Sequence, residues 1–101
     1  MEIVSKGEGR NLILELKGEL DHHGAQSSIQ QIEFALDAAL PLTLTLDFSG
    51  VTFMDSSGIA VVLRTQRRMS LLGGSTTLRG IPPQAQKVFD AIGISRFVTV
   101  Q

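Results

Sequence analysis

The alternation of two leucine-rich strands with helical segments most constrains the fold of this chain. Leucine occupies every second position of residues 11–17, and the same pattern returns over residues 42–46. A period of two predicts a strand with one buried face. Weaker strand candidates lie at residues 2–5, 75–79 and 97–100.

Helical periodicity fills the intervals between these strands. Apolar residues recur at spacings of three and four over residues 25–39, which predicts an amphipathic helix ending before Pro41. A second helix is predicted over residues 59–72, where Gly73-Gly74 suits the helix end. Pro82-Pro83 begins a third helix, which ends before Gly93.

This order of elements predicts an α/β fold with a mostly parallel sheet, because helices connect successive strands by right-handed crossovers. Strands covered on both faces are usually apolar throughout, whereas these strands alternate. We therefore expect the strands in sequential order, with the helices mainly on one face of the sheet. The first strand should pair antiparallel at an edge, and residues 1–101 should form one domain.

Composition excludes several classes of function. The net charge of −1 and the five aromatic residues, all phenylalanine, argue against nucleic-acid binding. The chain has no cysteine, and the pair His22-His23 makes at most an incomplete metal site, so no metal or cofactor is expected. With no signal peptide and no apolar run of membrane-spanning length, a cytoplasmic protein without direct membrane insertion is predicted.

The motif Asp55-Ser56-Ser57-Gly58 lies where the central strand should pass into the second helix. Asp55 or Ser56 could cap the helix by accepting hydrogen bonds from its first N–H groups. Alternatively, the partial positive charge and free N–H groups of a helix start could support a phosphate on Ser57. Both interpretations remain open from the pattern alone.

A catalytic serine is not expected. A nucleophilic serine needs a base, and His22 and His23 are the only histidines. The Gly-x-Ser-x-Gly motif of serine hydrolases is absent, because Asp55 stands two residues before Ser57. Phosphate-loop and dinucleotide-binding fingerprints are absent too.

The orientation of the second helix indicates a surface for a partner. At about 100° per residue, one side carries the expected core residues Ile59, Val62, Leu63, Gln66 and Met69. The opposite side carries Ser57, Ala60, Val61, Arg64 and Arg68. The arginines could simply form a solvated face. A partner surface, however, explains the small apolar residues beside the serine better than solvent does.

Four segments together resemble the anti-sigma factor antagonists, the single-domain bacterial branch of the STAS superfamily. They are GELDHH (18–23), LDFSGVTFMDSSGIAVVL (46–63), LLGG (71–74) and KVFDAIGI (87–94). The resemblance covers almost the whole chain, with the motifs in the order and spacing of the family.

The resemblance implies a partner-switching mechanism. Such antagonists bind an anti-sigma factor that is also an ATP-dependent serine kinase, and binding releases a sigma factor. The kinase phosphorylates the second serine of the motif, here Ser57, which dissociates the complex, and a metal-dependent phosphatase restores the active form. The resemblance therefore implies a substrate of the kinase that has no enzymatic activity of its own. The partner-binding residues expected on this basis are Asp21, Asp55, Ser56, Ser57, Ala60, Val61, Arg64 and Arg68.

Two other functions remain open from the sequence. Related domains serve as soluble subunits of lipid or anion transport systems and in stress-signalling assemblies, where the serine could be merely structural. A protein of a different class, an enzyme or a small-ligand binder, would use the loop around Asp55 to Ser57 as an anion pocket.

Overall fold

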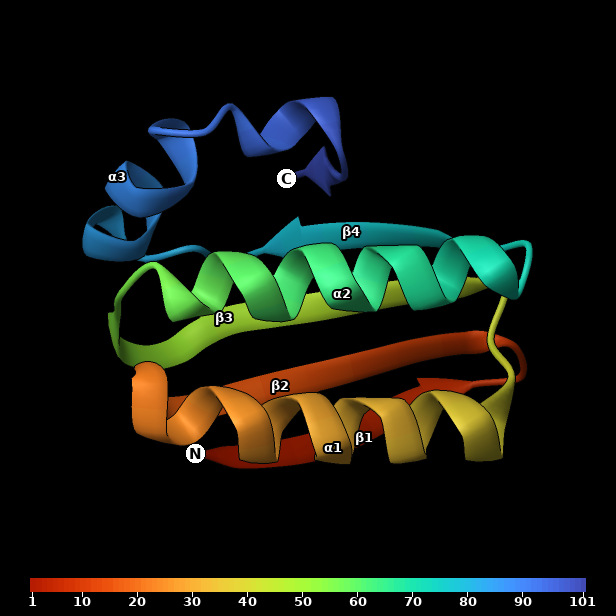
Figure 1. Cartoon of the computed structure of the whole chain (residues 1–101). Helices are drawn as coiled ribbons and strands as arrows, with labels where there is room; N and C mark the ends of the chain where they lie inside the picture. The colour runs from red at the N-terminus through yellow and green to blue at the C-terminus, as the bar shows by residue number, and fades with distance from the viewer.

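The computed structural model describes all 101 residues and contains one five-stranded sheet with strand order β1-β2-β3-β4-β5 (Figure 1). β1 pairs antiparallel with β2, and the other neighbouring strands pair parallel. The elements in chain order are β1 (Glu2–Glu8), β2 (Asn11–Leu20), α1 (His22–Ala39), β3 (Thr43–Met54), α2 (Ser57–Leu71), β4 (Ser75–Arg79), α3 (Pro83–Asp90), the 3₁₀ helix η1 (Ile94–Arg96) and β5 (Thr99–Val100).

The predicted fold class is confirmed: the strands follow sequential order and the antiparallel strand lies at an edge. The predicted lengths are less accurate. β3 continues to Met54, far beyond the predicted segment 42–46, and β1 continues to Glu8. β5 is shorter than predicted, because Phe97 follows η1 and only Thr99 and Val100 pair with β4.

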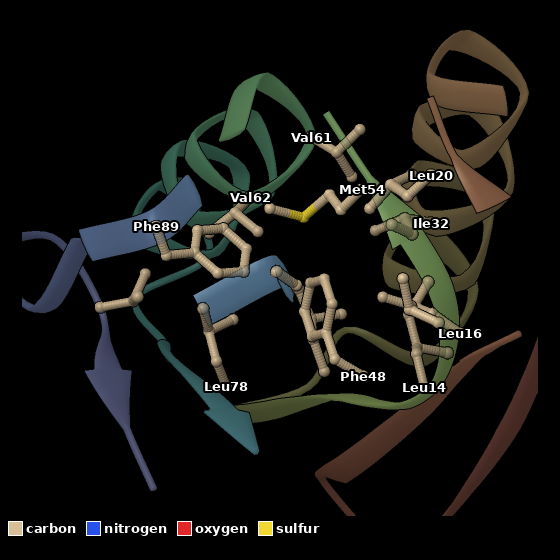
Figure 2. Close-up of a cluster of buried hydrophobic side chains, with 14 of the residues drawn as sticks. Leu14, Leu16, Leu20, Ile32, Phe48, Met54, Val61, Val62, Leu78 and Phe89 are labelled. Carbon is tan, nitrogen blue, oxygen red and sulfur yellow. The ribbon is translucent and has the colours of Figure 1, made fainter. Parts of the chain in front are cut away.

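A row of leucines across the sheet forms the centre of the hydrophobic core. The pairing register places Leu14 of β2 beside Leu46 of β3, and Leu46 beside Leu78 of β4. All three side chains are fully buried, as is Phe48 further along β3 (Figure 2). The period-two pattern therefore identifies the core face of the sheet correctly.

The helices cover this same face. α1 and α2 lie side by side across the sheet, with α3 near the start of α2 (Figure 1). The ring of Phe89 on α3 meets the ring of Phe48 edge to face, with centroids 5.4 Å apart (Figure 2). Because Phe48 belongs to the core row, α3 also packs on the helical side. None of these helices is long and apolar enough to span a membrane.

The opposite face of the sheet is half-buried and polar. It carries Glu15, Asp47 and Arg79 at neighbouring positions of β2, β3 and β4. Arg79 Nε lies 3.1 Å from Asp47 Oδ2, and the pKa of Asp47 is lowered by its hydrogen bonds from Ser49 and by Arg79, despite burial, which opposes this. This face is therefore a solvated surface with its own ion pairs, as the alternation predicts.

Candidate protein-binding site

Two strand-to-helix junctions lie next to each other at one end of the sheet. Leu20, the last residue of β2, pairs with Met54, the last residue of β3. An aspartate follows each strand, and the N–H of Asp55 donates to the carbonyl of Leu20 at 3.3 Å. Asp21 and Asp55 therefore lie on the same edge of the sheet, as expected for carboxyl ends of adjacent parallel strands.

Asp21 caps α1. Its Oδ1 accepts a hydrogen bond from the N–H of Gly24 at 2.9 Å, and its extended backbone is typical of an N-cap residue. An added Cβ at Gly24 would lie 2.8 Å from the carbonyl oxygen of Glu19, so a glycine suits this crowded first turn. The Asp21 side chain is therefore used in a local hydrogen bond within the first turn of α1.

Asp55 connects the two junctions. Its Oδ1 accepts from the N–H of Ser57 at 2.8 Å, and its Oδ2 accepts from the N–H of His22 at 3.2 Å. The pKa of Asp55 is lowered, chiefly by the hydrogen bond from the Ser57 N–H and further by that from His22. One carboxylate thus holds the first residues of α1 and α2 together.

The start of α2 offers fewer free donors than the sequence suggested. The N–H of Ser57 is taken by Asp55, the N–H of Gly58 donates to the Asp55 carbonyl at 3.0 Å, and that of Ile59 donates to the Ser56 carbonyl at 3.1 Å. The capping interpretation is therefore correct for Asp55, while Ser56 makes no side-chain cap. The expectation that unpaired N–H groups support a phosphate is wrong for these three donors.

Gly58 allows α2 to start directly against the end of β3. A Cβ at this position would collide with Cγ and Sδ of Met54 and would lie 3.2 Å from a methyl group of Leu20. A larger residue here would require the Met54 side chain or the start of α2 to move. The glycine of the motif therefore permits the close packing of α2 against the end of β3, next to Ser57.

Gln84 of α3 holds the same junction from the other side. Its Nε2 donates to the carbonyl of Met54 at 2.7 Å, and its Oε1 accepts from the N–H of Met54 at 2.9 Å. The side-chain amide of Gln84 thus pairs with both backbone groups of Met54, as a residue of a neighbouring strand would. Nothing in the sequence pattern singled out Gln84, because the contact depends on where α3 packs.

A groove runs between α1 and α2 on the outer surface of the helical layer, and we call it the α1–α2 groove. Its first part has a volume of about 400 Å³, and its second about 490 Å³. Ala60, Arg64 and Glu33 line both parts, which shows that they are continuous. Ser57 lines the first part and Arg68 the second, so four of the predicted partner-binding residues share one surface.

Val61 does not belong to that surface, and its predicted place in the partner stripe is wrong. Its side chain is fully buried and points into the core beside Met54 (Figure 2). The buried side of α2 comprises Gly58, Val61, Val62, Thr65 and Met69, whereas Ile59, Leu63 and Gln66 are only partly buried. The helix is rotated relative to the predicted orientation because it packs against α1 as well as the sheet.

Two of the three arginines of α2 form ion pairs with α1. Arg64 lies 3.4 Å from Glu33, and Arg68 contacts both Glu33, at 3.4 Å, and Asp37. The pKa of Arg68 is raised by its hydrogen bond and charge interaction with Asp37. These ion pairs link the walls of the α1–α2 groove and offset part of its positive charge. Arg67 forms no ion pair.

Sequence reasoning identified residues on α2 but missed the wall contributed by α1. That wall includes His22, Ala25, Gln26, Ile29, Gln30 and Glu33. The acidic residues Glu33 and Asp37, spaced four apart on the predicted first helix, were the available signal, since they match the spacing of Arg64 and Arg68.

Comparison with known proteins agrees with this architecture. Residues 2–101 match the STAS domain family. The chain belongs to that family.

A similar sequence and a similar solved structure both carry the name of an anti-sigma factor antagonist. The chain is 32% identical to the anti-sigma F factor antagonist of Lysinibacillus sphaericus over 94 residues, which cover 93% of this chain and 78% of the relative. The anti-sigma factor antagonist SpoIIAA in its unphosphorylated form superposes with a TM-score of 0.82 at 28% identity, covering 99% of this STAS chain and 88% of SpoIIAA.

The phosphorylated form of SpoIIAA, described as a Bacillus cell fate determinant, superposes with a TM-score of 0.74, also at 28% identity. The alignment covers 99% of this chain and 91% of that protein. Structures of SpoIIAA in the unphosphorylated and the phosphorylated form therefore both share the fold seen here.

Proposed function

We propose that the protein is a cytoplasmic anti-sigma factor antagonist. In this proposal it is a binding module and not an enzyme: it binds an anti-sigma factor and is released when Ser57 is phosphorylated. The resemblance in sequence to antagonists over nearly the whole chain supports this assignment, as does the similarity to SpoIIAA in both phosphorylation states.

The position of Ser57 in the α1–α2 groove carries the proposal. Ser57 is half-buried at the first residue of α2 and lines the groove with Ala60 and Arg64. A partner that fills this groove contacts the serine directly. Because that partner is also the proposed kinase, one surface serves both binding and modification.

A phosphate at Ser57 would act through charge and volume. It adds about −1.5 to −2 charges next to Asp55, whose carboxylate already receives the Ser57 N–H. With the nearby N–H groups already paired, few donors remain to neutralise the added charge. A loss of about 3–4 kcal/mol in binding free energy lowers partner affinity a few hundredfold.

The same arrangement disfavours binding of a small anion at this loop. A bound anion needs free donors, whereas the first N–H groups of α2 already have partners and a carboxylate faces them. The proposed partner is therefore a protein surface. Asp21, Asp55 and Ser56 contribute at the rim of the junction, and Ala60, Arg64 and Arg68 contribute along the groove.

Phosphorylation by the cognate anti-sigma kinase tests the proposal. Incubation with the kinase and ATP should add one phosphate, and peptide mapping should place it on Ser57. Ser57→Ala should abolish incorporation, while the matched variant Ser56→Ala should retain it, because Ser56 lies one residue outside the groove lining. A metal-dependent phosphatase should remove the phosphate. Incorporation that persists in Ser57→Ala contradicts the assignment.

A further inference from the structure

The sheet has one long free edge. β1 comprises seven residues and has no neighbour on its outer side, whereas the opposite edge strand β5 comprises two (Figure 1). A long exposed edge presents unpaired N–H and C=O groups to another strand. We propose that β1 pairs antiparallel with β1 of a second copy of this chain, around a two-fold axis at Val4.

The charges along β1 select that axis. In a two-fold antiparallel pair, opposed side chains must point to the same face, so the axis passes through a residue position. Centred on Val4, the pairing sets Glu2 of each copy opposite Lys6 of the other. Centred on Ser5 it sets Glu2 opposite Glu8, and centred on Lys6 it opposes two lysines. An axis at Gly7 also gives two attractive pairs, Lys6 with Glu8, but it overlaps only residues 6–8 of the two strands. The Val4 register combines two attractive pairs with an overlap of residues 2–6.

Lys6 is already oriented for this arrangement. Its Nζ lies 3.3 Å from Glu15 Oε1 across the β1–β2 pair, on the polar face of the sheet. Glu2 and Val4 share that face, because they lie four and two positions before Lys6, respectively, along the strand. In the paired strands, Lys6 would lie between Glu15 of its own chain and Glu2 of the second copy.

The other face of β1 supplies apolar surface. Ile3 and Ser5 line a groove of about 390 Å³ against α1, together with Phe34, whose side chain is 77% exposed. The Val4 register sets Ile3 of one copy opposite Ser5 of the other, so the two grooves become continuous. Pairing would cover Ile3 and Phe34, which gives the exposed phenylalanine an apolar environment.

This surface is separate from the α1–α2 groove. In Figure 1, β1 is the outermost strand of the sheet and runs behind α1, whereas α2 lies over β3 and β4. Ser57 and Ala60 therefore stay accessible in the paired form, and the pairing does not depend on the proposed function. A contact limited to one strand and one exposed side chain belongs to the class of small, reversible interfaces.

Cysteine crosslinking tests the register directly, because the chain has no native cysteine. Opposed residues in such a pair have Cβ atoms about 4.5–5.5 Å apart, close enough for a disulfide with small adjustment. Val4→Cys should therefore form a covalent dimer on mild oxidation. The matched variant Ser5→Cys should stay reduced, since its position faces Ile3. Equal crosslinking of both variants, or of neither, overturns the proposed register.

Charge exchange provides a second test that needs no crosslink. Glu2→Lys and Lys6→Glu should each abolish self-association, because each opposes like charges across the axis. A mixture of the two should form a heterodimer, since every opposed pair is again Lys with Glu. Sedimentation velocity from micromolar to millimolar concentration detects each outcome. A wild-type chain that stays monomeric throughout, or a mixture that does not associate, overturns the proposal.

Discussion

Adjacent residues of α2 belong to two different surfaces, the hydrophobic core and the α1–α2 groove that we propose binds a partner. Val61 is fully buried against the core, and its neighbour Ala60 is exposed in the α1–α2 groove. Buried Thr65 satisfies its hydroxyl by donating to the Val61 carbonyl at 2.7 Å, whereas exposed Arg64 pairs with Glu33 across the groove. Substitutions at adjacent positions should therefore have unrelated consequences.

The largest effect is expected at Val61. Val61→Glu places a carboxylate in the fully buried layer beside Met54, where no partner can satisfy it. The free energy of unfolding should fall by about 3 kcal/mol or more. Chemical denaturation followed by circular dichroism measures this loss. A variant as stable as wild type would show that the inner face of α2 is not the packed one.

The same substitution one residue earlier should leave the fold intact. Ala60→Glu lies on the exposed side and places a glutamate four residues before Arg64, a favourable helical spacing. Stability should stay within about 0.5 kcal/mol of wild type. Affinity for the anti-sigma partner should fall by about 2 kcal/mol, roughly thirtyfold, because the added charge enters the groove. Calorimetric titration measures the affinity of the variant for the partner. An unchanged affinity would show that the partner binds outside the α1–α2 groove.

A smaller effect is expected at Asp55, which joins the starts of both helices. Its pKa in the folded chain lies below the ordinary value of 3.8, so the folded state favours the ionised carboxylate. The resulting stability is complete above that value and is lost as the pH falls through the lowered pKa. Asp55→Asn should be less stable than wild type at neutral pH, and this difference should shrink in acid.

Denaturant midpoints of wild type and Asp55→Asn at about pH 7 and about pH 3 test this dependence. Asp90→Asn is the matched control for the loss of one negative charge, because the Asp90 carboxylate accepts a side-chain hydrogen bond from Gln86 of the same helix, α3. A stability difference that stays constant or grows in acid would contradict the role given to the Asp55 carboxylate.

The smallest effect is expected at Arg64. Its side chain is 60% exposed and its ion pair with Glu33 is 3.4 Å long, so Arg64→Ala should change stability by no more than about 0.5 kcal/mol. Partner affinity should fall less than in Ala60→Glu, and the loss should diminish with added salt if the charge steers association. Affinity measured at low and high ionic strength checks this. A loss independent of salt would indicate a direct buried contact instead.

The sequence predicts the layer order and the core face of this fold well, because leucines at every second position mark which face of each strand is buried. It does not predict the length of β3. After Phe48, Ser49-Gly50 interrupts the alternation, and the facing strand β2 shifts register near Lys17 and again near Gly18. Such irregularities depend on pairing between strands and leave no local periodic signal.

The orientation of α2 could not be predicted for a related reason. Residues 59–63 are all apolar, so several rotations of the helix bury an apolar stripe. Gly58 and Thr65 belong to the buried side but look like surface residues by composition. The adjacency of Asp21 and Asp55 was predictable from parallel strand order, whereas the bond from Asp55 to His22 depends on the packing of two helices.

The binding of phosphorylated and unphosphorylated protein to the anti-sigma partner tests the central claim most directly. Protein phosphorylated stoichiometrically on Ser57 should bind a few hundredfold more weakly than unmodified protein, with a closely similar melting temperature, because the switch acts at the groove surface. Equal affinities would contradict the account. A large drop in melting temperature would also contradict it, because the loss of binding would then follow from unfolding.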